Sequence, residues 1–204
     1  MTDTDAKAPG GITPSQTVGP YFAYCLTPDD YPTRTLFSAD LTVPALAGRA
    51  IRIEGRVLDG DGAGVSDAMV EIWQADPDGR YAHPADLGRP SNSGFTGFGR
   101  AACDAEGRYI FTTVKPGRVP GPNGIVQAPH IAMTVFARGM LAHLWTRIYF
   151  ADEAEANAGD PVLALVTDPA ARATLIAQRE PGAQAAYRFD IRLQGDGETV
   201  FFAA

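Results

Sequence analysis

Apolar and polar residues alternate along several short stretches of this chain, as they do in β-strands with one buried face. The clearest stretch begins at His130. One face of this predicted strand is entirely apolar and is expected to pack in the core: Ile131, Met133, Val135 and Ala137. The opposite face is mixed and carries His130, Ala132, Thr134, Phe136 and Arg138. The first face packs the fold, so the second is free to carry function.

Similar patterns, each bounded by turn residues such as DGDG, DPDG or DAEG, predict six more strands. They cover residues 51–58, 69–75, 108–114, 143–150, 187–193 and 198–203. The last two are expected to form a C-terminal hairpin around QGDG. Trp73 and Trp145 lie within apolar strands, so both are expected in the core. Many short strands with turn punctuation predict an all-β fold, a mixed β-sandwich with long loops.

Helical signals are few. Asp168 or Thr167 can cap a helix that has Pro169 at its first position and runs through ARATLIAQRE to residue 180. Residues 152–158 are expected to form a second short helix. No internal repeat or linker interrupts the pattern, so the chain is expected to be a single domain spanning residues 1–204.

Three segments have no regular pattern. Residues 1–11 are polar and glycine-rich, which predicts a loose tail. Residues 12–26 combine proline and glycine with Tyr21, Phe22 and Tyr24, which fits either an arm lying on another surface or a loop packed on its own domain. Residues 76–107 form a long segment, and loops of this length are usually functional or disordered.

Composition narrows the class of protein. The chain has 204 residues, of which 45% are hydrophobic and 20% charged, and these values are typical of a globular domain. A net charge of −7 argues against nucleic acid as a partner and means that an anionic ligand needs local positive groups. No apolar run is long enough for a membrane helix, and no signal peptide is recognisable. We therefore expect a cytoplasmic protein in which Cys25 and Cys103 are reduced thiols.

The three histidines do not by themselves define a site. His83 and His143 have no evident partners, and no CxxC pair or nucleotide-binding glycine motif is present. His130 would need a second donor two residues later to hold a metal on its own strand, but that position is Ala132. Metal sites in proteins usually take three or four ligands, so His130 alone predicts a hydrogen-bonded interior histidine.

Six separate features resemble the intradiol ring-cleavage dioxygenases: TPSQTVGPY, GRYAHP, the proline- and glycine-rich loop at residues 116–124, APHI, FARG and AYRFDI. The resemblance covers the chain from about Thr13 to Phe202. In metal-binding members of that family, two tyrosines and two histidines hold a non-haem ferric iron. Tyr81 matches the first tyrosine and His130 the first histidine, whereas Val119 and Ala132 occupy the other two positions. Valine and alanine have no donor atom, so the resemblance implies that this chain holds no metal itself.

The resemblance then implies a hetero-oligomer. A homologous iron-binding beta subunit would carry the Fe³⁺, and the assembly would cleave 3,4-dihydroxybenzoate (protocatechuate) with O₂ to 3-carboxy-cis,cis-muconate. This chain would form one wall of the substrate pocket. The positions that match this wall are Thr17, Gly19, Pro20, Tyr21 and Arg138.

Two other functions remain open at this stage. The chain could be a non-catalytic scaffold or binding module, and in that case Arg138 would make only a surface salt bridge. It could also be a self-sufficient catechol dioxygenase whose ligands are not recognisable from the sequence.

Overall fold

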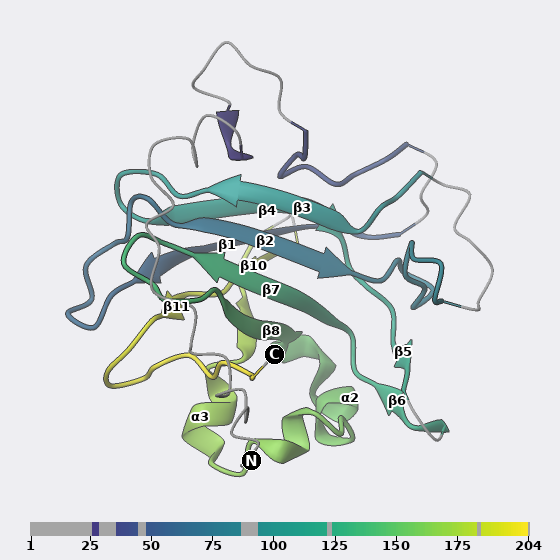
Figure 1. The fold of residues 1–204 in the computed structure, drawn as a ribbon. Helices are drawn as coiled ribbons and strands as arrows, with labels where there is room; N and C mark the ends of the chain where they lie inside the picture. Colours follow the sequence, from purple (N-terminus) through teal and green to yellow (C-terminus); the bar gives the residue numbers. More distant parts are fainter. Residues whose placement is uncertain are drawn as a thin grey trace, which may run out of the picture.

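Strands dominate the computed structural model, which describes residues 26–28, 36–44, 48–86, 94–121, 124–182 and 185–203. They form two layers (Figure 1). One layer contains β1 (Ala50–Leu58), β4 (Arg108–Val114), β10 (Ala186–Arg188) and β11 (Ile191–Arg192). The other contains β2 (Met69–Gln74), β3 (Phe98–Ala102), β7 (His130–Phe136) and β8 (Leu144–Phe150). The tail and all but the last residue of the predicted arm lie outside the described residues.

Strand β9 (Ile176–Arg179) joins the two layers, because it pairs in parallel with β8 and antiparallel with β10. Strand β1 is likewise mixed, antiparallel to β4 and parallel to β10 and β11. Parallel and antiparallel pairs therefore coexist in one nine-stranded sheet, and the predicted mixed β-sandwich is confirmed. A separate ribbon of two short strands, β5 (Val119–Pro120) and β6 (Val126–Gln127), precedes β7.

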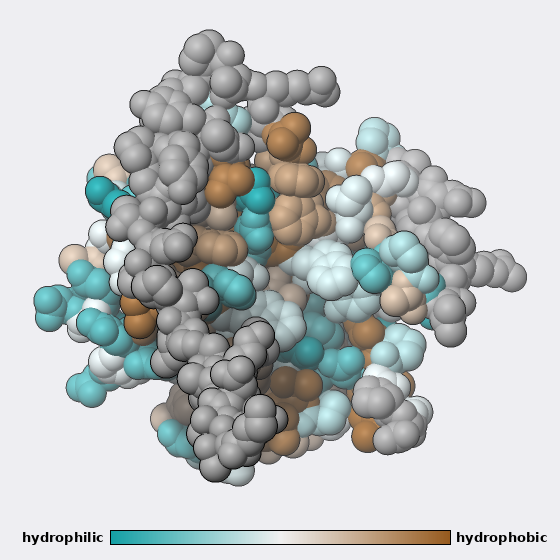
Figure 2. Space-filling model, viewed as in Figure 1, coloured by the Kyte–Doolittle hydropathy of each residue, from teal (hydrophilic) through white to brown (hydrophobic). Residues whose placement is uncertain are grey.

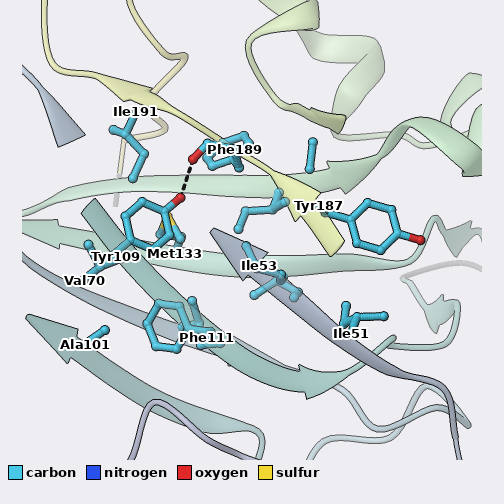
Figure 3. Close-up of a cluster of buried hydrophobic side chains, with 14 of the residues drawn as sticks. Ile51, Ile53, Val70, Ala101, Tyr109, Phe111, Met133, Tyr187, Phe189 and Ile191 are labelled. Carbon is cyan, nitrogen blue, oxygen red and sulfur yellow. Dashed lines mark hydrogen bonds between the residues drawn. The ribbon is translucent and has the colours of Figure 1, made fainter. Parts of the chain in front are cut away.

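The core lies between the layers. Strand β7 buries Ile131, Met133 and Val135 completely, as the alternation predicted. They pack against side chains of the opposite layer in one continuous cluster (Figure 3). Within that cluster the hydroxyl of Tyr109 donates a hydrogen bond to the carbonyl of Phe189, so its one polar atom is satisfied.

Both tryptophans were placed wrongly by the sequence pattern. Trp73 is 39% exposed and Trp145 is 37% exposed. Strand alternation explains this result, because Ile72 and Thr146 take the inward positions beside them. The outer face of the second layer therefore presents two large aromatic side chains.

The C-terminal third also differs from the prediction. Helix α3 (Pro169–Ala173) begins as expected, since the Asp168 side chain caps the amide of Ala170 at 3.0 Å, but it ends well before residue 180. The residues beyond it form β9, because pairing with β8 and β10 outweighs their helical propensity. Residues 198–203 form only an isolated bridge, between Phe202 and Trp145, so the predicted hairpin is wrong.

The remaining helices are short. Residues 151–158 form η3 (Ala151–Glu153) and α2 (Ala154–Ala158), close to the predicted range. Together with η4 (Leu163–Leu165) and α3 they lie beside β8 at one end of the sandwich (Figure 1). Leu163 and Leu175 cover the outer side of Tyr149 there and form a second, smaller core. Within the described ranges, no helix has the length and apolarity needed to cross a membrane.

Candidate functional site

Cross-strand register arranges the outer face of the second layer. One row of side chains crosses the sheet, because each member lies directly opposite the next on the neighbouring strand. The row contains Phe98 on β3, Trp73 on β2, Ala132 on β7 and Arg147 on β8. Neighbouring side chains in such a row are about 5 Å apart and can touch. Figure 2 shows that apolar side chains interrupt the polar surface over β3 on this side of the molecule. Ala132 is the one small residue in its row.

Tyr81 and His130 meet beside this row. The Tyr81 hydroxyl lies 3.4 Å from Nε2 of His130, and the tyrosine ring packs on Trp73 with centroids 5.0 Å apart. The other ring nitrogen, Nδ1, lies 2.8 Å from the carbonyl of Ala128, which can only accept, so Nδ1 carries the proton. Nε2 is then an acceptor, and the Tyr81 hydroxyl donates to it. His130 is 2% exposed and is satisfied at both nitrogens.

The charge states follow from this environment. Burial, assisted by the positive charge of Arg147, lowers the pKa of His130 to about 4, so the imidazole is neutral at pH 7. Burial raises the pKa of Tyr81, although the Arg147 charge opposes the rise, so the phenol keeps its proton. The pair is therefore a neutral hydrogen-bonded unit.

Arg147 is a cation whose charge acts on both Tyr81 and His130. Its Nη1 donates to Oε1 of Gln127 at 2.8 Å and lies 3.4 Å from the hydroxyl of Tyr149. Sequence reasoning missed this residue. Its only signal was the alternation of HLWTRIYF, which places Arg147 on the outward face, and its position opposite Ala132 required the strand register.

Asp160 fixes the backbone that carries His130. This carboxylate is 1% exposed and accepts hydrogen bonds from the amides of Ala128, Val162 and Leu163 and from the Tyr149 hydroxyl. It therefore holds the segment before β7 against the turn that follows α2. Sequence reasoning missed Asp160 as well, because its partners lie up to 32 residues away.

The loop that carries Tyr81 depends on Gly79. This glycine has φ of 76°, and an added Cβ would lie 2.0 Å from the carbonyl oxygen of Arg118. Only glycine fits such a close approach in this conformation. The DPDG turn thereby brings residues 79–86 against Val119 and Gln127, and between them lies a cavity of about 670 Å³.

The arrangement does not fit a metal ion. Val119, on β5, and Ala132, on β7, provide no donor, so Tyr81 and His130 are two ligands where such sites need three or four. The positive charge of Arg147, which acts on both Tyr81 and His130, also disfavours a cation between them. In the part of the chain that the structure describes, no group of three or more His, Cys, Asp or Glu residues could hold a metal.

Of the predicted substrate-pocket residues, the structure describes Arg138. Thr17, Gly19, Pro20 and Tyr21 fall outside the described residues. Arg138 follows the end of β7, eight residues from His130, or about 25 Å along an extended strand. Its side chain is 70% exposed and forms an ion pair with Asp67. Arg138 can therefore serve only a pocket at the opposite end of the strand from Tyr81 and His130.

Comparison with known proteins defines the class. A family model described as Dioxygenase matches residues 17–195, which is most of the chain. The dioxygenase domain of a dioxygenase and carbohydrate-binding protein fusion from Streptomyces sp. SirexAA-E has a similar fold, with a TM-score of 0.56 and 25% identity over 91% of this chain and 99% of that one. The chain belongs to the intradiol ring-cleavage dioxygenase family, as its motifs indicated.

Individual relatives narrow the similarity further. The alpha chain of protocatechuate 3,4-dioxygenase from Burkholderia cepacia is 51% identical over 197 residues, which are 93% of this chain and 96% of that one. The beta chain of protocatechuate 3,4-dioxygenase from the same organism is 39% identical over 165 residues, covering 74% of this chain and 67% of that one. The chain is thus similar to both kinds of subunit, and more so to the alpha chain.

Proposed function

We propose that this chain is the iron-free, alpha-type subunit of a hetero-oligomeric protocatechuate 3,4-dioxygenase. A homologous beta subunit holds the ferric iron, and the assembly uses O₂ to open the ring of 3,4-dihydroxybenzoate in the cytoplasm. The observation that carries this proposal is the Tyr81–His130 pair. These two side chains satisfy each other and are flanked by Val119 and Ala132, neither of which can bind a metal.

In this proposal the chain contributes binding and orientation to the partner's site. Gly19 and Pro20 set the course of an arm that approaches a flat ring, while Thr17 and Tyr21 line it. Arg138 offers a planar guanidinium with five donors that suits a substrate carboxylate. Its side chain is mostly exposed and pairs with the half-buried Asp67, so it stays accessible, since a surface ion pair of this kind is weak.

Production of the chain alone and together with a candidate beta subunit tests the proposal. We expect about one iron per pair, held by the partner, and oxygen-dependent consumption of 3,4-dihydroxybenzoate only by the assembled pair. Stoichiometric, tightly bound iron in this chain purified alone would support a self-sufficient enzyme. An active partner whose turnover and substrate affinity do not change when this chain is added would support a scaffold.

Substitutions in the assembled pair test the pocket wall. We expect Arg138→Ala to raise KM about tenfold or more, because a charged hydrogen bond to the substrate is lost, and Arg138→Lys to recover part of the effect. Arg179→Ala is the matched control, since this exposed arginine lies on β9. Equal kinetics for Arg138→Ala, Thr17→Ala and the wild type would remove these residues from the pocket.

A further inference from the structure

An open aromatic hollow lies on the outer face of the second layer, and its volume is about 170 Å³. The outward side chains that line it belong to four neighbouring strands: Glu71, Trp73, Phe98, Ala132, Thr134 and Trp145. Both tryptophans are partly exposed there. A cavity of about 150 Å³ holds one benzene ring, and exposed aromatic surface often marks a place where another group packs. The size and the walls of the hollow therefore suit one phenylalanine side chain.

One row of side chains leads from the hollow to the edge of the sheet. It consists of Arg100 on β3, Glu71 on β2, Thr134 on β7 and Trp145 on β8, each directly opposite the next. The last three line the hollow, and Arg100 stands at the outer end of the row, on the edge strand. Neighbouring strands are about 4.8 Å apart, so the hollow lies about 5 to 10 Å from the strand that carries Arg100.

Arg100 holds the segment of chain that reaches this edge. Its Nη1 donates to the carbonyl of Leu26 at 3.3 Å. The guanidinium is itself fixed, since it donates to Glu71 at 2.8 and 2.5 Å and lies 5.0 Å from the centre of the Phe37 ring. Only 11% of the Arg100 side chain is exposed. Leu26 is therefore anchored at the end of the row that leads to the hollow.

The sequence just before Leu26 contains aromatic residues that suit the hollow. Residues 21–25 are YFAYC and lie outside the described residues. Phe22 is four residues from Leu26, a separation of about 6 Å in a helix and up to about 13 Å in an extended chain. Both values are compatible with the distance from the Arg100 strand to the hollow. Of the three aromatic residues in this segment, only Phe22 has no hydroxyl group that would need a hydrogen-bond partner in an apolar hollow.

We propose that the Phe22 side chain fills the hollow over Ala132 and fastens the base of the N-terminal arm to this chain's own sheet. The ring packs on Ala132 between Trp73 and Trp145, with edge or offset-stacked contacts to the indoles. Residues 12–26 could lie on another surface or on their own domain, and this contact places their base on their own domain. The contact goes beyond the proposed function, which assigns roles to residues 17–21 and Arg138, and it does not depend on that function.

Tryptophan fluorescence tests the contact in the full-length chain, because Trp73 and Trp145 are its only two tryptophans. We expect Phe22→Ala to shift the emission to longer wavelength and to raise the acrylamide quenching constant about twofold or more, since both indoles lose their cover. Phe22→Leu should retain part of the protection, and Tyr24→Ala, the neighbouring aromatic control, should retain all of it. Because turnover and iron content are not measured, the proposed function can fail while this contact is present.

A substitution in the hollow separates this contact from a general effect of the arm. Ala132→Leu fills the hollow and displaces the ring, so Phe22→Ala should no longer change the quenching constant in that background. An unchanged quenching constant in Phe22→Ala, an equal rise in Tyr24→Ala, or an equal effect of Phe22→Ala with and without Ala132→Leu would overturn the inference. Protection that appears only at high protein concentration, or only when a candidate beta subunit is added, would also overturn it, because a second copy or the partner would then cover the hollow.

Discussion

Two partly buried cations in this molecule, Lys115 and Arg147, differ in whether they have carboxylate partners. Lys115 lies 3.0 Å from a carboxylate oxygen of Asp152 and 2.6 Å from one of Glu153, and it faces the rings of Phe150 and Tyr187. Among the residues that the structure describes, Arg147, on the other layer, forms hydrogen bonds only with the Gln127 amide and the Tyr149 hydroxyl. One cation is fully compensated and the other is not.

The difference separates a structural charge from an available one. Burial disfavours the charged form of Lys115, but hydrogen bonds to Glu153 and Asp152 outweigh it and raise its pKa. The lysine ties the start of the loop after β4 to η3, which helps to close the sandwich. Within the described part of the chain, Arg147 forms no such tie with another charge; it lies beside the neutral Tyr81–His130 pair and acts on both side chains.

Removal of the compensated cation should have the largest effect on stability. Lys115→Met leaves two carboxylates without their counter-charge, so we expect a loss of about 2 kcal/mol, below the value for a fully buried pair because Asp152 and Glu153 are partly exposed. Urea unfolding at neutral pH measures it. Arg179→Met is the control, and an equal loss there would mean that Lys115 has no special role.

Low pH should reduce the stability difference between the wild type and Lys115→Met. Hydrogen bonds from Lys115 and Tyr187 outweigh burial and lower the pKa of Asp152 below its ordinary value of 3.8. A carboxylate with a lowered folded-state pKa contributes stability that is present above its unfolded pKa and is lost as pH falls through the folded value. The difference between wild type and Lys115→Met should therefore narrow as pH falls below about 4. A difference that stays constant down to about pH 2 would contradict this linkage.

A carboxylate beside Arg147 should give this arginine an ion-pair partner, as Lys115 already has. Gln127→Glu places a negative charge where Oε1 already accepts from Nη1 at 2.8 Å. We expect a gain of up to about 1 kcal/mol in the free energy of unfolding, since the pair is only partly buried. Gln127→Leu removes the hydrogen bond without adding charge and should not raise the free energy of unfolding.

These contrasts also show what the sequence could reveal. Alternation placed Ile131 and Met133 inside correctly, because a two-residue period fixes the face of a strand. It misplaced Trp73, since a run of apolar residues conceals which face is inward. The helix predicted from Pro169 to residue 180 begins as expected but ends at Ala173, because pairing with distant strands makes Ile176–Arg179 a strand.

The site around Tyr81 and His130 was likewise predictable only in part. Motifs located Tyr81 and His130, and the residue types at Val119 and Ala132 excluded a complete ligand set. The position of Arg147 opposite Ala132 was not predictable, because it depends on the register between β7 and β8. The sequence thus predicted which side chains can act as ligands, but not which side chains become neighbours across the strands.

The smallest expected effect concerns the two tyrosines on either side of Arg147. Tyr149 donates to Asp160 at 3.1 Å and is completely buried, so Tyr149→Phe should cost about 1 kcal/mol. Tyr81 is partly exposed and its hydroxyl lies 3.4 Å from His130, a long hydrogen bond, so Tyr81→Phe should cost less than about 0.5 kcal/mol. Urea unfolding of both variants measures the pair. A larger loss in the free energy of unfolding for Tyr81→Phe than for Tyr149→Phe would show that the Tyr81–His130 pair stabilises the fold, as Lys115 does. Arg147 would then be the one residue of this group without such a structural role.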